Sequence, residues 1–218
     1  MARSFEVTDQ VQSYVVDHGS FPPSPVLSQL REDTAALGRS SGMQIGHDEG
    51  QLLTWLTRLV GARNAIEVGT FTGYSSLCIA EGLADGGRLL CCDVSEEWTA
   101  LARGAWEKAG VADRIELRIA PALETLTALP DEPTIDLAFI DADKGGYVSY
   151  WDALVPRMRP GGVIATDNTL WSGDVVKDDS SDETLTAVKA FNDHVRADDR
   201  METVMLPAYD GLTLSRRR

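Results

Sequence analysis

The sequence has no excess of positive charge. It holds 20 lysines and arginines against 34 aspartates and glutamates, which gives a formal net charge of −14 at pH 7. A surface this acidic repels polyanions, so we expect no general binding to nucleic acid and none to an anionic membrane. The basic run at residues 216–218 is too short to reverse that expectation.

Targeting and membrane-spanning segments are also lacking. Residues 1–20 carry Glu6, Asp9 and Asp17, and they lack the apolar stretch of about 7–15 residues that a secretory signal contains. No later segment approaches the ~18 uninterrupted apolar residues that a membrane-spanning helix needs. We therefore expect a soluble, cytoplasmic protein with no membrane partner.

Cysteine and histidine are scarce, with three residues of each. Cys78, Cys91 and Cys92 lie inside apolar runs, and their number is odd. These features favour reduced thiols in the core over disulfides. The histidines are too scattered along the chain to suggest a zinc site.

The remaining composition is that of an ordinary globular protein, with 43% hydrophobic and 25% charged residues in a chain of 218. This length predicts a single domain, residues 1–218. Residues 1–60 form amphipathic, leucine-rich pieces interrupted at Phe21–Pro25 and Ser40–Gly42, and these predict a helical N-terminal cover. Residues 61–218 predict an α/β core.

In that core, short apolar runs alternate with segments of helical periodicity. The expected strands are Ala65–Val68, Arg88–Cys92, Ile115–Ile119, Ile135–Ile140 and Gly162–Thr166. The expected helices are Tyr74–Leu83, Glu96–Ala109, Ala122–Ala128, Tyr147–Arg157 and Glu183–Ala197. Glu202–Leu206 and Leu212–Ser215 predict a closing antiparallel pair. This pattern predicts a Rossmann-like, doubly wound α/β fold with a mostly parallel, seven-stranded sheet.

A glycine turn follows the first expected strand. Gly69 and Gly73 allow close approach of a ligand, and Ser75 with the free amides of the next helix can receive a carboxylate or phosphate. The turn is neither a dinucleotide fingerprint, because Phe71 replaces the middle glycine, nor a P-loop, because no Gly-Lys-Ser/Thr follows. A tight turn without a ligand is the alternative.

Asp93 ends the second expected strand. It stands where an acidic residue, about 20 residues after the glycine turn, reaches the ribose of a nucleoside cofactor. The alternative is that Asp93 only caps the helix that begins near Glu96.

Polar residues end two later strands, and Asp141, Asp167 and Asn168 can converge if these strands are parallel neighbours about 4.8 Å apart. Two carboxylates and an amide suit Mg²⁺, or Ca²⁺ or Mn²⁺. Lys144 lies beside them, where a cation and partial burial would lower its pKa and make it available as a base. Caps and turns at the strand ends, and a solvated lysine, are the alternatives.

In this order, the segments resemble the cation-dependent small-molecule O-methyltransferases, the group that includes caffeoyl-CoA and catechol O-methyltransferases. The resemblance runs from about Gly42 to Arg217. The matching segments are Asp48-Glu49-Gly50-Gln51, Glu67 to Ser75, Ala120 to Leu123, Asp141 to Lys144, Asp167 to Trp171 and Asp210 to Leu214.

The resemblance implies S-adenosylmethionine as the methyl donor. By similarity, its methionine part is held by Met43, Ile45, Gly69 and Ser75, its ribose by Asp93 and its adenine by Ala122. Glu67 supports the glycine turn and is included among the cofactor residues. Asp141 serves both the cofactor amino group and the metal, whose other ligands are Asp167 and Asn168.

The resemblance also implies the chemistry: a divalent ion chelates two adjacent hydroxyls of a catechol, and Lys144 takes the proton of the reacting one. The implied catalytic residues are Lys144, Asp141 and Asn168. Trp171 has the position of an aromatic wall beside the substrate ring, Lys144 also faces the substrate, and Tyr209 is a further lining candidate. A homodimer is expected because family members are commonly dimers.

Two departures bear on the substrate. Plant caffeoyl-CoA enzymes carry arginines and tyrosines where this chain has the acidic and small residues of Asp182–Val188, so a free catechol or phenolic is favoured over a CoA ester. Ser41 replaces a gatekeeping tryptophan of the animal enzyme, which suggests a more open pocket. The alternatives to catalysis of methyl transfer are an NAD-type oxidoreductase and a non-catalytic binding module of the same fold.

Overall fold

The computed structural model describes residues 7–19, 22–177 and 181–218. Seven strands form one sheet in the order β3-β2-β1-β4-β5-β7-β6. Their bounds are β1 Asn64–Val68, β2 Arg88–Asp93, β3 Ile115–Ile119, β4 Ile135–Ile140, β5 Met158–Thr166, β6 Met201–Leu206 and β7 Leu212–Arg217. Strands β1 to β5 pair in parallel, and β7 runs antiparallel to both β5 and β6. The α/β fold with a closing antiparallel pair is confirmed.

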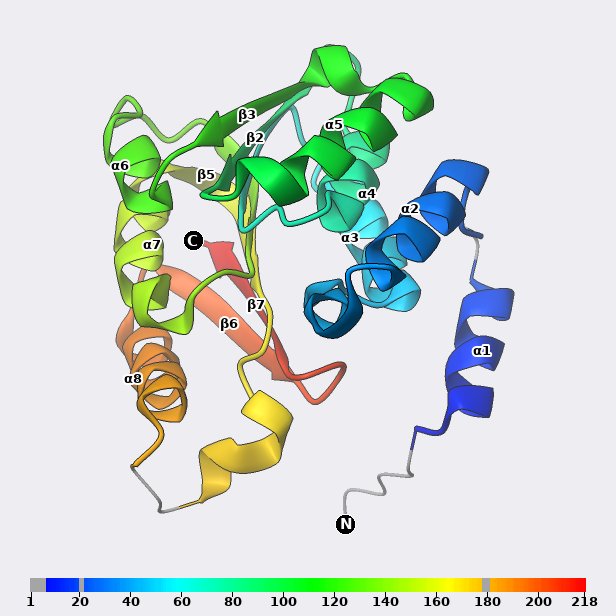
Figure 1. Ribbon diagram of the computed structural model, residues 1–218. Helices are drawn as coiled ribbons and strands as arrows, with labels where there is room; N and C mark the ends of the chain where they lie inside the picture. The colour runs from blue at the N-terminus through cyan, green and yellow to red at the C-terminus, as the bar shows by residue number, and fades with distance from the viewer. Residues whose placement is uncertain (1–6, 20–21, 178–180) are drawn as a thin grey trace.

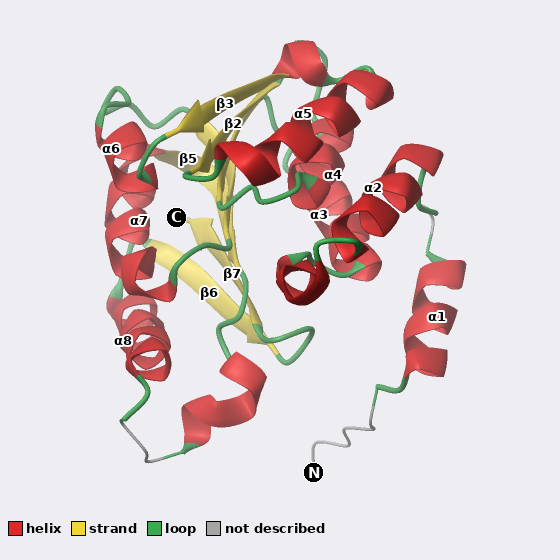
Figure 2. Ribbon diagram, viewed as in Figure 1, coloured by secondary structure: helices red, strands yellow, loops and turns green. Residues whose placement is uncertain are grey.

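Helices cover both faces of the sheet (Figures 1 and 2). The α-helices are α1 Asp9–His18, α2 Pro25–Ala35, α3 His47–Leu59, α4 Tyr74–Gly82, α5 Glu96–Ala109, α6 Ala122–Thr127, α7 Tyr147–Leu154 and α8 Glu183–Ala197. The 3₁₀ segments are η1 Gly38–Met43, η2 Ala112–Arg114, η3 Lys144–Gly146, η4 Val155–Arg157 and η5 Trp171–Val176. None of the described helices is long and apolar enough to span a membrane.

Two hydrophobic cores hold the layers together, one on each face of the sheet. Leu53 and Leu77 bring α3 and α4 into the first core, and Trp151 and Phe191 bring α7 and α8 into the second. Strand β4 contributes to both, and all six of its residues are buried. This explains its continuous apolar run, because a strand covered on both faces needs no alternation.

The order of the strands places the ligand site. Strand β1 has β2 on one side and β4 on the other, so the chain reverses direction across the sheet between β1 and β4. In open sheets of this kind, a ligand lies beyond the carboxyl ends of the strands at such a reversal. The loops after β1, β2, β4 and β5 meet there.

Two expected elements differ from the structure. Strand β5 begins at Met158 rather than at Gly162, and its pairing with β4 shifts register between Ile135 and Leu137. Pro160 lies in this shifted stretch, where its lack of a backbone N–H is tolerated. The helix expected to run from Tyr147 to Arg157 ends at Leu154 and continues as η4, because Pro156 cannot extend the α-helical hydrogen bonding.

The helical cover expected for residues 1–60 is seen in α1, α2, η1 and α3. Figure 1 draws α1 on the outer side, beyond α2 and α3. Part of the expected break at Phe21–Pro25 lies outside the described residues, but Ser24 accepts a hydrogen bond from the Leu27 amide and so caps α2. The single-domain organisation stays a prediction.

Candidate active site

A cavity of about 1130 Å³ lies at the carboxyl edge of the sheet. Its wall includes all the predicted site residues except Glu67, namely Met43, Ile45, Gly69, Ser75, Asp93, Ala122, Asp141, Lys144, Asp167, Asn168 and Trp171. A smaller cavity of about 230 Å³ lies at the opposite edge, lined by the first residues of β1 to β4 and by none of the predicted site residues. The large cavity is therefore the candidate site.

Two positions in the glycine turn after β1 accept only glycine. Gly69 has φ +91°, and a Cβ there would lie 1.9 Å from the carbonyl oxygen of Asp141 at the end of β4. Gly73 has φ +87°, and its Cβ would lie 2.5 Å from the Cβ of Ala102 in α5. Because glycine has no Cβ, the turn can pack directly against the end of β4 and against α5. No side chain from these two positions then fills the cavity.

Asp93 ties the end of β2 to this turn. Its Oδ2 accepts hydrogen bonds from the amides of Thr70 and Phe71 at 2.9 and 2.7 Å, and its Oδ1 accepts one from Ser95 at 2.7 Å. Ser95 is the residue that caps α5, through the Trp98 amide. A carboxylate has about four acceptor positions, so Asp93 can still accept from a ligand.

Glu67 lies beneath the turn and not on the cavity wall. Its side chain is completely buried, and neither carboxylate oxygen makes a hydrogen bond of normal geometry to any residue that the structure describes. Burial raises its pKa to about 7, an effect partly offset by the nearby groups of Ser75, Thr70 and Cys91. Direct contact of Glu67 with a cofactor stays a prediction.

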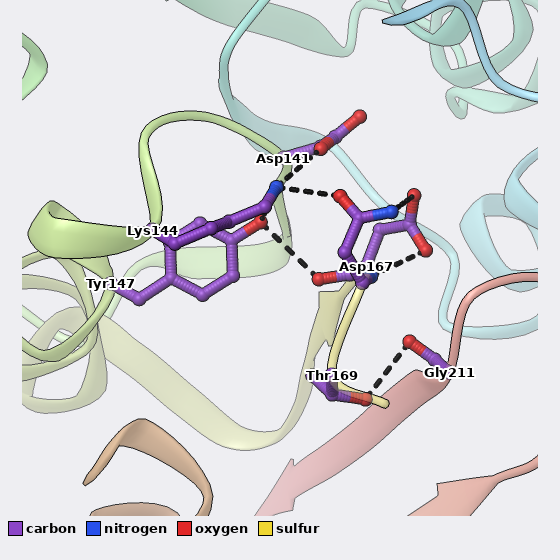
Figure 3. A network of polar contacts seen from close by, with 7 residues as sticks. Asp141, Lys144, Tyr147, Asp167, Thr169 and Gly211 are labelled. Atoms are coloured by element: carbon purple, nitrogen blue, oxygen red, sulfur yellow. Dashed lines mark hydrogen bonds and ion pairs between the residues drawn. The ribbon is translucent and has the colours of Figure 1, made fainter. Parts of the chain in front are cut away.

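Lys144 is the centre of a polar network at the ends of β4 and β5 (Figure 3). Its Nζ lies 3.1 Å from Asp141 Oδ1, 2.5 Å from Asn168 Oδ1 and 2.6 Å from the hydroxyl of Tyr147. The Lys144 side chain is only 9% exposed, so these partners replace most of its water. The Nζ also lies 6.0 Å from the centre of the Trp171 ring.

Asp167 and Asn168 are held together at the end of β5. Asn168 has φ +57°, and its backbone amide and Nδ2 both donate to the Asp167 carboxylate, at 2.6 and 3.1 Å. Burial, followed by the charge of Asp141, raises the pKa of Asp167 to about 7. Burial also raises the pKa of Asp141, although Lys144 opposes the shift.

The donor set fits a hard divalent cation. Asp141, Asp167 and Asn168 offer only oxygen ligands, which Mg²⁺ and Ca²⁺ prefer. The ammonium group of Lys144 already shares oxygens of Asp141 and Asn168, which shows that these two strand ends can hold one positive charge between them. No cluster of three or more His, Cys, Asp or Glu residues suited to a metal occurs in the described ranges, so the amide of Asn168 is needed to complete the set.

The structure brings two further residues to the site. Tyr147 is fully buried, and its hydroxyl donates to the Asp167 carbonyl oxygen at 3.2 Å while accepting from Lys144. The sequence assigns Tyr147 no role, because its spacing of three residues from Lys144 does not show where its hydroxyl points. Glu49 lies on the cavity wall and is 2% exposed. It stands in one of the resembling segments, but the sequence gives it no role.

The loop between β6 and β7 closes one side of the cavity. The Asp210 carbonyl accepts from the Leu170 amide at 2.9 Å, and its carboxylate accepts from Ser172. These bonds bring Tyr209 and Asp210 to the cavity wall beside Trp171. Trp171 is partly buried and has φ +47°. Both aromatic residues predicted for the substrate side therefore line the same cavity as Lys144.

Met43, Ile45 and Ala122 lie on the remaining walls. Met43 ends η1 and is 47% exposed, and Ile45, two residues later, is buried. Ala122 is the first residue of α6, after the end of β3. The structure therefore gathers residues from widely separated parts of the chain around one cavity, as the resemblance implied.

A sheet of this order, with its antiparallel closing pair and a glycine turn opening onto the cavity, is the fold of a Rossmann-like methyltransferase. The O-methyltransferase family model matches residues 17–218. The chain therefore belongs to the S-adenosylmethionine-dependent O-methyltransferase family. The oxidoreductase alternative is wrong.

Similar proteins include a caffeoyl-CoA O-methyltransferase from Zea mays, 38% identical over 99% of this chain and 85% of that protein. Among solved structures, a putative O-methyltransferase from Klebsiella pneumoniae is 33% identical with a TM-score of 0.88, covering 96% of each chain. An O-methyltransferase from Bacillus cereus in complex with SAH is 31% identical, also with a TM-score of 0.88, covering 96% of this chain and 97% of that one.

Proposed function

We propose that this protein is a divalent-cation-dependent O-methyltransferase that transfers the methyl group of S-adenosylmethionine to a hydroxyl of a catechol-type small molecule. The observation that carries the proposal is the convergence of Asp141, Asn168 and Tyr147 on the Lys144 nitrogen at the wall of the large cavity. Two strand ends thus offer acidic oxygens and a base in one place. Family membership supplies the reaction class.

Cofactor binding is assigned to the walls nearest the glycine turn. S-adenosylmethionine supplies an electrophilic methyl group on a sulfonium. In this assignment Asp93 accepts from the ribose, Gly69 leaves room for the methionine part, and Asp141 accepts from the amino group. Met43, Ile45 and Ser75 complete the methionine side, and Ala122 contacts the adenine. The SAH bound in the Bacillus cereus relative supports this use of the cavity.

The cation is assigned to Asp141, Asp167 and Asn168. When bound, the ion supplies positive charge that lowers the pKa of a catechol hydroxyl and stabilises the phenolate. Lys144 accepts the hydroxyl proton at Nζ, in its neutral form. Tyr147 and Asn168 fix the position of Nζ, and Trp171 orients the aromatic ring. Holding the phenolate in line with the methyl group contributes up to roughly 7–11 kcal/mol in well-oriented cases.

The acceptor is proposed to be a free catechol, a phenolic acid or an aldehyde rather than a CoA ester. Asp182 caps α8 by accepting from the amides of Thr184 and Leu185, and Thr184 lines the cavity. This rim is acidic and small, without the basic residues that would pair with a polyanion. The Zea mays relative, by its name, acts on caffeoyl-CoA, so the two proteins would differ in the acceptor.

The test is methyl transfer from S-adenosylmethionine to a panel of catechols and matched monophenols, with added Mg²⁺ and again with EDTA. We expect turnover of the catechols that EDTA abolishes and excess Mg²⁺ restores. Turnover that resists EDTA would refute the cation's role. Binding of the cofactor without turnover of any catechol would favour the non-catalytic alternative. Homodimerisation stays a prediction that sedimentation velocity can check, and a cytoplasmic location also stays a prediction.

A further inference from the structure

The cavity wall is strongly acidic. Among its described residues, the acidic side chains are Glu49, Asp93, Asp141, Asp143, Asp167 and Asp210, and the basic one is Lys144. A divalent ion would offset the charges of Asp141 and Asp167, and the amides of Thr70 and Phe71 donate to Asp93. The wall therefore retains negative charge that neither the proposed ion nor Lys144 neutralises.

Glu49 differs from the other acids of the wall. Asp143 accepts from the Tyr150 hydroxyl at 2.6 Å, and Asp210 accepts from the Ser172 amide. The Glu49 Oε1 is buried, and no donor within residues 7–19, 22–177 and 181–218 pairs with it. Leaving a buried carboxylate without a partner is costly, so this side chain is suited to a ligand that brings its own donor.

The surroundings of Glu49 place it on the acceptor side of the cavity. It stands in the first turn of α3, and burial, followed by the charges of Asp167, Asp141 and Asp48, raises its pKa to about 9. A cation beside the carboxyl group would lower that pKa again. Burial, followed by the charges of Asp48, Glu49 and Asp167, raises the pKa of Tyr209. Tyr209 belongs to the β6–β7 loop, which is bonded to the segment around Trp171, and Glu49 lines the same cavity as both aromatic residues. Glu49 therefore lies among the groups assigned to the acceptor.

We propose that the Glu49 carboxylate is a subsite for a cationic group of the acceptor, and that the preferred acceptor is a catechol bearing an ammonium group. The inference rests on the proposed function, because it names the substrate class of the same site. An ammonium group supplies both the hydrogen-bond donor that Glu49 lacks and the positive charge that the wall lacks. The catechol hydroxyls then face Lys144 while the ammonium group faces α3.

The test compares three acceptors that share a ring and differ in the charge of a short side chain: dopamine, 4-ethylcatechol and 3,4-dihydroxyphenylacetate. In the wild type we expect kcat/KM to fall in that order. Glu49→Gln should lower kcat/KM for dopamine by about 10- to 100-fold, the size expected for loss of a charge-assisted hydrogen bond. It should leave 4-ethylcatechol little changed. Glu107→Gln, on the exposed face of α5, is the matched control and should change none of the three.

Binding measurements distinguish recognition of the acceptor by Glu49 from binding of the ion and from binding of the cofactor. Calorimetry should give the same affinities for Mg²⁺ and for S-adenosylmethionine in the wild type and in Glu49→Gln. A tenfold or larger loss of either affinity would assign Glu49 to the ion or the cofactor and overturn the inference. Glu49→Asp, which keeps the charge and shortens the side chain, should retain part of the preference for dopamine.

The outcomes also separate the inference from the proposed function. Turnover of all three catechols with equal kcat/KM in the wild type, or an equal loss for all three in Glu49→Gln, would overturn the inference alone. Absence of turnover with all three would refute the proposed function, and the inference with it. Thermal unfolding of each variant confirms that the kinetic comparison is made on folded protein.

Discussion

Lys144 is the residue on which the proposed proton transfer depends, and its environment comes from three elements. Asp141 follows β4, Asn168 follows β5, and Tyr147 begins α7, yet all three reach the same nitrogen. The strand-end residues could be predicted from the sequence, because adjacent parallel strands bring their carboxyl ends together. Tyr147 and Glu49 could not, since their roles depend on which helix face packs toward the cavity.

Replacing Lys144 should separate catalysis from binding. We expect Lys144→Met to lower kcat by about 10²- to 10⁴-fold, the usual contribution of a positioned acid or base. Affinity for S-adenosylmethionine should stay close to that of the wild type, because Lys144 lies on the acceptor side. Single-turnover kinetics and calorimetry measure the two effects, with Lys108→Met on the exposed part of α5 as the control. An unchanged rate at saturating catechol would exclude Lys144 as the base.

Glu67 should make stability depend on pH. Its pKa rises from an ordinary 4.5 to about 7 in the folded protein, chiefly through burial. At pH values well below 4.5 the carboxyl is protonated in both states and carries no penalty. As the pH rises toward 7, the unfolded state ionises first, so the folded state loses about 3 kcal/mol relative to a variant that cannot ionise.

The measurement is urea unfolding of the wild type and Glu67→Gln at several pH values between 4 and 8. The difference in unfolding free energy should move in favour of Glu67→Gln as the pH rises. A difference that is constant over this range would show that Glu67 titrates alike in both states.

At the scale of elements, the site depends on how closely β1 and β4 approach at their carboxyl ends. The alternation of strands and helices predicted this juxtaposition, and most of the element bounds agree with the structure within two residues. The irregular start of β5 was not predicted, because a shift of register depends on the partner strand and leaves no local pattern. The same limit applies to Asp136, whose partners lie at the start of β1, just before it, and in β5.

A substitution in the glycine turn tests how closely the end of β1 approaches the end of β4. Gly69→Ala would place a methyl group 1.9 Å from the Asp141 carbonyl oxygen, at a backbone angle that disfavours alanine. We expect this variant to lose cofactor binding and to unfold at a lower temperature. Gly104→Ala, in the middle of α5 with open space around the new Cβ, should be neutral or stabilising by up to about 1 kcal/mol. Equal behaviour of the two variants in thermal melts and calorimetry would contradict the proposed geometry.

Asp136 joins the amino ends of three strands. Its Oδ2 accepts from the amides of Arg63 and Asn64, both at 2.8 Å, and its Oδ1 pairs with Arg159. Burial opposes ionisation, but these donors lower the pKa of Asp136 on balance. Asp136 therefore stabilises the fold above its unfolded pKa, and this contribution is lost as the pH falls through the folded value.

The corresponding variant is Asp136→Asn, which keeps the size of the side chain but not its charge. At neutral pH we expect it to lower the free energy of unfolding by about 1.5–3 kcal/mol, the range for hydrogen bonds to a charged group. Asp131→Asn, in the exposed turn before β4, should change stability little. Chemical unfolding measures the stability of both variants. An equally large loss for Asp131→Asn would mean that net charge, and not the hydrogen bonds of Asp136, determines the effect.

At the scale of the whole molecule, charge and shape act together on the choice of acceptor. The formal net charge of −14 is matched by a cavity wall on which acids outnumber bases. The sequence composition predicts the overall charge but not the acidity of the cavity, which depends on which carboxylates the fold brings to the wall. A polyanionic acceptor therefore meets repulsion both on approach and in the site.

This repulsion predicts an acceptor preference that salt should weaken. We expect caffeic acid to be methylated at least as efficiently as caffeoyl-CoA, because the free acid carries much less negative charge than the CoA ester. Screening shortens the range of charge interactions from about 30 Å at 0.01 M ionic strength to about 10 Å at 0.1 M. The kcat/KM of the CoA ester should therefore rise more steeply with salt than that of caffeic acid. Side-by-side kinetics over this range measure both, and a CoA ester that is preferred at every ionic strength would mean that a cationic surface outside the cavity receives it.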